Sequence, residues 1–220
     1  MKTCLLAGAT GLTGQYLWPL LAESEAYQAV HLLLRRTVEH PSPKVHQHLV
    51  DFDQLDEWQD LPHIDHVYCT LGTTLAKAGS KTAFRKVDHG YIVGMARLAQ
   101  RLGASCFTFI SSIGADADSW YSFYLKVKGQ TEKDVAALKL PATFALRPSL
   151  LVGPRAEHRP AEAFGEKLFN TLSPLMIGPL ENYRAIHVAT VAHAMLALTL
   201  ASEGEGFRAV ESSEIAKYQG

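Results

Sequence analysis

The chain has 220 residues, 47% of them hydrophobic, and its 21 Lys and Arg against 22 Asp and Glu leave a net charge of −1. This size fits one α/β domain over residues 1–220, and the balanced charge argues against a nucleic-acid partner, whose binding surface is typically a basic patch. The first residues hold too short an apolar run for a signal peptide, and no run approaches the roughly 20 residues that cross a bilayer. Because the three cysteines lie in apolar stretches, we expect free buried thiols in a soluble protein of the cytoplasm, without a membrane partner.

Short apolar runs alternate with longer segments of helical period, which predicts a Rossmann-like, doubly wound parallel sheet. Strands are expected near residues 2–7, 29–34, 46–50, 65–70, 105–110 and 142–147, and helices near 12–24, 80–101 and 121–138. Apolar side chains recur every three or four residues along the second helix, so one of its faces should pack on the sheet.

A glycine-rich loop, GATGLTG, follows the first strand and leads into the first helix. Gly8 would allow a tight turn, Gly11 a close approach of the backbone to a pyrophosphate, and Gly14 close packing of helix on strand. The spacing is GxxGxxG, which differs from the simplest dinucleotide fingerprint. Its place between a strand and a helix nevertheless favours a dinucleotide site over a plain turn.

The second strand ends in LLLRRT, which places Arg35 and Arg36 where an acidic residue would bind the ribose 2′-hydroxyl of NADH. Guanidinium groups form bidentate hydrogen bonds with phosphate. The pair therefore predicts NADP(H) as the cofactor. On the third strand, His46 and His48 share a face, but no third ligand is near in sequence, so surface imidazoles are expected and no metal.

The third helix carries Tyr124 and, one turn later, Lys128. Residues four apart in a helix meet, and an ammonium beside a phenol favours the ionised phenol. The pair is thus either a proton donor with its tuning cation or two unrelated side chains on one helix face. No GxSxG elbow accompanies any serine, which disfavours a hydrolase.

Regular alternation weakens after Pro148. Residues 153–187 contain several prolines and an apolar stripe, which suits a small C-terminal cap that would contact substrate. The stripe could equally close the open end of the sheet. Thr190 is the expected N-cap of a last helix.

Four motifs in order resemble the short-chain dehydrogenase/reductase superfamily, and more narrowly its atypical Tat-interacting oxidoreductase group, whose members bind NADPH. They are LGTTLAKAGS (71–80), FISSIGAD (109–116), YLKVKG (124–129) and RPSLLVGPRAEHRP (147–160), together with the glycine loop and the arginine pair. The similarity runs from residue 4 to about residue 170.

The resemblance implies roles for particular residues. The cofactor phosphates would lie beside Thr10, Gly11, Leu12 and Thr13, and the 2′-phosphate beside Arg35 and Arg36. The adenosine side would lie beside Leu71 and Gly72, and the nicotinamide ribose beside Tyr124 and Lys128. Leu151 and Arg159, which follow the sixth strand, would also belong to the cofactor site. Asp51 would flank adenine, although a solvated turn explains it equally well.

Two positions depart from the pattern or leave it open. Asp88 stands in the long helix where many extended members carry Asn, so a proton relay through that position is in doubt. Either Ser111 or Ser112 could be the catalytic hydroxyl. We prefer Ser112, because a glycine-containing turn follows it.

The combined motifs imply an NADPH-dependent oxidoreductase that reduces a small carbonyl or enone, with Tyr124, Lys128 and Ser112 as catalytic residues. The alternative is an NADPH-binding redox sensor or interaction protein with little or no turnover, for which a protein partner is conceivable. Fold resemblance cannot choose between these two classes.

Overall fold

The computed structural model describes residues 1–39, 42–55, 62–153 and 182–218, and its centre is a seven-stranded sheet in the order β3-β2-β1-β4-β5-β6-β9. Every pair of neighbouring strands is parallel. The strands are β1 Lys2–Ala7, β2 Tyr27–Leu34, β3 Val45–Leu49, β4 His66–Cys69, β5 Cys106–Ile110, β6 Ala142–Arg147 and β9 Gly206–Glu211. The predicted doubly wound parallel sheet is confirmed, and its order reverses between β1 and β4, where such sheets bind ligands.

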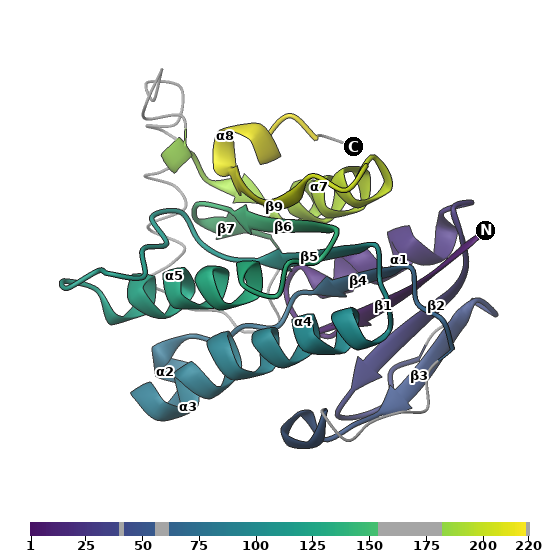
Figure 1. Cartoon of the computed structure of the whole chain (residues 1–220), viewed down its shortest axis with the longest axis horizontal. Helices are drawn as coiled ribbons and strands as arrows, with labels where there is room; N and C mark the ends of the chain where they lie inside the picture. The colour runs from purple at the N-terminus through teal and green to yellow at the C-terminus, as the bar shows by residue number, and fades with distance from the viewer. Residues whose placement is uncertain (40–41, 56–61, 154–181, 219–220) are drawn as a thin grey trace.

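Helices cover both faces of this sheet (Figure 1). They are α1 Gly14–Glu23, the short α2 Leu75–Ala78, α3 Lys81–Arg85, α4 Ile92–Arg101, α5 Phe123–Ala136, α7 Val188–Leu200 and α8 Ser212–Ile215, with the 3-10 turn η1 Phe52–Gln54 and the π-helix η2 Lys86–Tyr91. Helices α1 and α7 lie on one face, and α4 and α5 lie on the other.

The alternation of side chains along β1 explains these two layers. Cys4 and Leu6 point into the core beneath α1 and α7, whereas Leu5 and Ala7 point into the core beneath α4. All four are fully buried. A strand that is apolar on both faces is typical of a parallel sheet covered on both sides.

The structure corrects three details of the predicted elements. The helix expected over 80–101 is divided into α3, η2 and α4. Strand β9 was missed, because it is a partly buried edge strand that follows a glycine-rich turn. The last helix begins at Val188, since the His187 ring accepts a hydrogen bond from Ala189 N at 3.2 Å, so Thr190 is not its N-cap.

The cap expected over 153–187 falls mainly on 154–181, outside the described residues. At its two ends the chain forms a short parallel pair, β7 (Leu151–Val152) with β8 (Ile186–His187). The domain division and the cap stay predictions.

The three cysteines, Cys4, Cys69 and Cys106, are free and buried, as expected. Burial raises the pKa of each thiol. In the described part of the chain, no helix has both the length and the apolar character needed to span a membrane.

The histidines of β3 have a partner on β2. His31 stacks on His46 and His48, with ring centroids 5.0 and 5.1 Å apart, and ring nitrogens of His31 and His48 lie 2.8 Å apart. His48 is half-buried, so the expectation of surface imidazoles holds for His46 alone. Within the described ranges, no group of three or more His, Cys, Asp or Glu could hold a metal ion.

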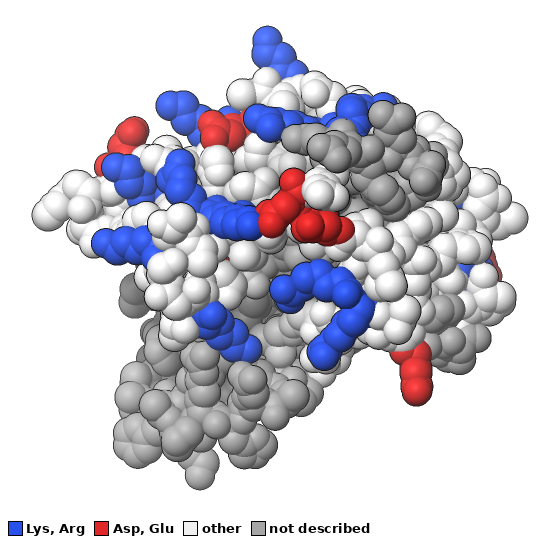
Figure 2. Space-filling view, turned by 90° about the horizontal axis from the view of Figure 1, so that it is seen from below, with Lys and Arg blue, Asp and Glu red and all other residues white. Residues whose placement is uncertain are grey.

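Charges of both signs lie next to one another on the face that Figure 2 shows. Lys and Arg side chains form separate groups there, with acidic side chains between them. Exposed ion pairs such as that of Lys86 with Asp53, whose charged atoms lie 2.6 Å apart, contribute little to stability.

Candidate active site

The glycine loop after β1 is packed too closely to accept side chains at two of its glycines. Gly8 has φ +91°, and a Cβ there would lie 2.6 Å from Thr70 Oγ1. A Cβ on Gly14 would lie 2.1 Å from the carbonyl oxygen of Gly8, whereas one on Gly11 would keep 3.2 Å from that oxygen. Gly8 and Gly14 therefore bring strand and helix together, and Gly11 N closes the turn on Gly8 O at 2.9 Å.

A cavity of about 440 Å³ lies beside this loop at the carboxyl end of the sheet. Arg35 and Arg36 are exposed on its wall. Phe52 lines it too, but Asp51 does not. The Asp51 carboxylate accepts a hydrogen bond from Asp53 N at 2.9 Å and caps η1, which agrees with the solvated-turn interpretation.

A second cavity, of about 750 Å³, continues from the first, since Thr10, Arg36 and Leu71 line both. Its wall includes the following sequence-predicted residues: Thr10, Gly11, Leu12, Thr13, Arg36, Leu71, Gly72, Ser112, Tyr124, Lys128 and Leu151. Gly14 lies beneath the loop and lines neither cavity, and Arg159 lies outside the described residues. We call the two cavities together the cleft.

Tyr124 and Lys128 enter the cleft from the first turns of α5. The helix begins at Phe123, because Ser122 accepts a hydrogen bond from Leu125 N at 3.3 Å. The Tyr124 ring packs on Phe84, with centroids 5.7 Å apart. The interpretation of two unrelated exposed side chains is therefore wrong for Lys128, whose side chain is only 5% exposed.

The Lys128 ammonium forms a buried ion pair with Asp88, with Nζ 2.7 Å from Oδ1. Burial lowers the pKa of this lysine, but attraction to Asp88 and Tyr124 and the hydrogen bond to Asp88 outweigh burial, so its pKa is raised. Lys128 is consequently a cation at neutral pH. Asp88 thus belongs to the site, although the sequence left its role open.

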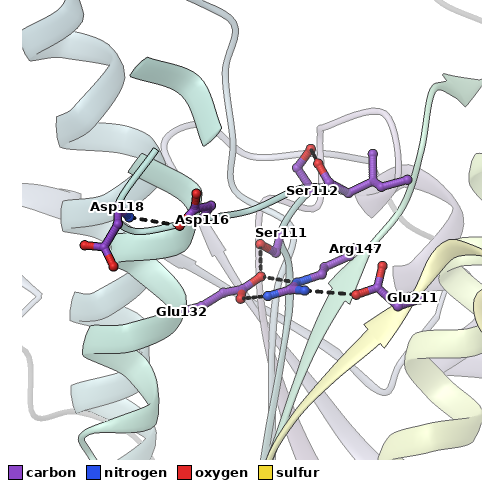
Figure 3. A network of polar contacts seen from close by, with 8 residues as sticks. Ser111, Ser112, Asp116, Asp118, Glu132, Arg147 and Glu211 are labelled. Atoms are coloured by element: carbon purple, nitrogen blue, oxygen red, sulfur yellow. Dashed lines mark hydrogen bonds and ion pairs between the residues drawn. The ribbon is translucent and has the colours of Figure 1, made fainter. Parts of the chain in front are cut away.

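The two serines after β5 have different partners (Figure 3). Ser111 Oγ donates to Glu132 at 2.5 Å, and Arg147 donates two further hydrogen bonds to that carboxylate, at 2.9 and 2.6 Å. Arg147 also donates to Glu211 at 2.9 Å. Ser112 Oγ lies apart from this network and makes a long hydrogen bond, 3.2 Å, to the next carbonyl.

The sequence as a whole is similar to one known family. A model of the NAD dependent epimerase/dehydratase family matches residues 4–210. The chain belongs to this family. Protein HTATIP2 of Rattus norvegicus is 36% identical over an alignment of 209 positions that covers 93% of this chain and 84% of that protein. Protein FMP52 of Debaryomyces hansenii, named mitochondrial, is 32% identical over an alignment of 224 positions that covers 97% of this chain and 96% of the relative.

These relatives confirm the resemblance to the atypical Tat-interacting group. A solved structure, MoeE5 in complex with UDP-glucose and NAD, has a TM-score of 0.67 at 18% identity and covers 98% of this chain and 80% of its own. At this identity the likeness shows the fold. The sequence thus places the chain in the epimerase/dehydratase family, and the solved structure shares its fold.

The expectation of a cytoplasmic location is contradicted. Several relatives, from Debaryomyces, Scheffersomyces, Candida, Eremothecium and Aspergillus, are named mitochondrial. The expectation used composition and the apolar run of the first residues, and neither property determines the compartment to which a folded domain is delivered.

The cleft fits the nicotinamide cofactors that this family binds. Two glycines whose Cβ would clash hold the loop against the strand, and the cavity beside the loop continues to Tyr124 and Lys128. Residues at the loop and beside β2 would hold the phosphates, and residues of α5 would face the reactive end.

Sequence reasoning missed three charged residues beneath the cleft: Glu132, Arg147 and Glu211. Glu132 follows Lys128 by four residues, so helical spacing could have placed both on one face. Arg147 ends an apolar strand, and a charge at that position signals a buried partner. Glu211 gave no signal, because its strand was not predicted.

Proposed function

We propose that this member of the family is an NADPH-dependent reductase of a small carbonyl compound or enone. The observation that supports this most directly is the continuous cleft, with two arginines at one end and the Tyr124, Lys128 and Ser112 side chains at the other. Arginine at the end of the second strand suits a 2′-phosphate. NADPH is therefore the cofactor of the proposal.

When bound, the cofactor supplies the hydride to the carbonyl carbon. Tyr124 donates its phenolic proton to the carbonyl oxygen as negative charge develops there, and Ser112 donates a hydrogen bond to the same oxygen. Ser112 suits this role better than Ser111, whose proton is already given to Glu132. Lys128 remains an ammonium and would hold the ribose hydroxyls of the bound cofactor.

The proposal is tested by replacing Tyr124 with Phe, which keeps the ring against Phe84 and removes the hydroxyl. We expect turnover to fall roughly 10²- to 10⁴-fold, because general acid catalysis typically contributes that much. NADPH affinity should change little. The assay follows NADPH oxidation with a panel of aldehydes, quinones and enones, while cofactor binding is titrated separately.

Tyr121→Phe is the matched control, since Tyr121 is 66% exposed three residues before Tyr124. That variant should keep full turnover. If wild-type protein binds NADPH and reduces no compound of the panel, the reductase proposal fails and the redox-sensor function takes its place.

A further inference from the structure

Asp88 is a buried carboxylate at the wall of the cleft, and the proposed reaction does not yet use it. Its side chain is 1% exposed and that of Lys128 is 5% exposed. A carboxylate buried this deeply is costly unless it is paired and hydrogen-bonded. The Asp88–Lys128 pair meets this condition inside the reaction centre, which raises the question of what it does there.

The backbone around Asp88 is shaped to direct this side chain into the site. Asp88 lies in the π-helix η2. Such helices are rare in proteins overall, but those that occur are often found at functional sites. Thr131 Oγ1 on α5 donates to the carbonyl oxygens of Asp88 and Val127, at 2.9 and 2.8 Å. The second carboxylate oxygen of Asp88 accepts Thr73 N at 2.8 Å. Asp88 therefore joins η2, α5 and the loop after β4.

Other titratable groups lie around the pair. Tyr124 faces it from α5 and Cys69 from β4, and Lys77 of α2 lines the same cavity. Burial raises the pKa of the Cys69 thiol to about 12, so this group is neutral at physiological pH. Tyr124 and the ribose side of the cleft thus face an ion pair of zero net charge where a lone ammonium would otherwise stand.

We propose that Asp88 is a positioning residue of the reaction centre: it holds Lys128 as a cation in a neutral pair, so that Tyr124 keeps its proton for delivery to the substrate oxygen. A lone ammonium beside a phenol would favour the phenolate, which accepts protons and suits oxidation of an alcohol. The pair therefore favours reduction. This inference rests on the reductase function proposed above.

The ionisation of Lys128 tests the inference without any turnover. The test compares wild type with Asp88→Asn, which keeps the side-chain shape and an acceptor for Thr73 N. NMR of ¹⁵N-lysine-labelled protein follows the Lys128 ammonium against pH, with and without NADP⁺. In Asp88→Asn we expect its deprotonation midpoint to fall by about one pH unit or more, because burial still lowers the Lys128 pKa while the attraction and the hydrogen bond to the Asp88 carboxylate are lost.

The control is Asp53→Asn, which removes an exposed carboxylate that is paired with Lys86 at 2.6 Å. It should leave the Lys128 midpoint unchanged. If Asp88→Asn does not fold, Asp88→Ser can replace it in the test. That variant also removes the carboxylate charge, and its smaller side chain still carries a hydroxyl that can accept a hydrogen bond. An Lys128 midpoint that is equal in wild type and in the Asp88 variant would overturn the inference.

The rate profile gives the second readout. Removing the negative charge of Asp88 makes it easier for Lys128 and for Tyr124 to lose a proton. The first of these two deprotonations should therefore occur at a lower pH in Asp88→Asn than in wild type. The alkaline limb of the reduction rate should therefore move down by about one pH unit, and an unmoved limb would overturn the inference. A shifted Lys128 midpoint in a protein that reduces no carbonyl would reject the proposed function and keep the ion-pair role of Asp88.

Discussion

Arg35 and Arg36 are the residues on which cofactor choice depends. They are exposed at the end of β2, and both line the adjoining cavity, where a bound ligand would meet them. A 2′-phosphate is the group that distinguishes NADPH from NADH. Affinity for NADPH should therefore be sensitive to this pair, and affinity for NADH should not.

The double variant Arg35→Ala/Arg36→Ala should bind NADPH at least roughly tenfold more weakly, since a charge-assisted hydrogen bond contributes about 1.5 to 3 kcal/mol. NADH affinity should be unchanged. Fluorescence titration with each cofactor measures both constants, and Arg97→Ala, at an exposed position on α4, is the control. Equal NADPH and NADH affinities in wild-type protein would refute the NADPH assignment.

At the scale of single residues, the sequence predicted those site residues that can be identified from their spacing or from their position after a strand. The glycine loop and the arginine pair follow predicted strands, and Tyr124 and Lys128 share a helix face. It could not predict the partner of Asp88, because Asp88 and Lys128 lie on different helices, 40 positions apart in the sequence, and meet only in the folded structure.

Among the elements, α5 and the loop before it set the position of the candidate catalytic groups. Gly129 of α5 lies against this loop, and a Cβ on Gly129 would be 2.1 Å from Ala117 N and 2.2 Å from the carbonyl carbon of Asp116. Asp116 N also donates to the Leu125 carbonyl at 3.1 Å. The glycine lets the loop that follows Ser112 pack directly on helix backbone.

Gly129→Ala should lower the free energy of unfolding by about 1 to 3 kcal/mol, the usual cost of overpacking, and should reduce turnover by displacing the loop. Gly90→Ala is the control, because a Cβ on this helical glycine meets nothing within 4 Å. That change should leave stability equal or slightly raised. Urea unfolding measures both, and equal stabilities of the two variants would contradict the packing argument.

Helices and strands with a clear apolar pattern could be predicted from the sequence. Elements whose position depends on contacts with distant parts of the chain could not. The six predicted strands are apolar enough to read from sequence, whereas β9 alternates weakly and is fixed by pairing with β6. Thr190 was a reasonable cap by residue type. His187 takes that role because β8 ends there and brings its ring to Ala189 N.

For the whole molecule, two buried histidines couple stability to pH. Burial, with smaller effects of His48 and His46, lowers the pKa of His31 to about 4. Burial and the nearby Lys2 ammonium lower the pKa of His66 to about 4. His66 also joins a buried chain of hydrogen bonds, with its ring 2.7 Å from the Tyr27 hydroxyl.

Both histidines are neutral in the folded protein above pH 4 but bind protons in the unfolded chain below about pH 6.5. Stability should therefore fall as pH drops from about 6.5 to about 4, by up to about 1.4 kcal/mol per pH unit for each histidine. Urea unfolding at a series of pH values measures the slope. In His31→Gln the slope of unfolding free energy against pH should decrease by the contribution of one titrating group. A wild-type stability that is constant over this pH range would contradict the prediction.

Strand β9 follows the other six strands of the sheet in the sequence, yet Glu211 at its end binds Arg147 beneath the cleft. During synthesis, six strands can leave the ribosome while the polar network under Ser111 still lacks this carboxylate. The edge of β6 is also uncovered until β9 pairs with it. A stalled chain, or one cut by a protease in the turn at 202–205, would thus keep the glycine loop and the arginine pair but lose Glu211, one of the two carboxylates that bind Arg147. The polar network under Ser111 is thereby complete only once the seventh strand of the sheet has been made and has paired with β6.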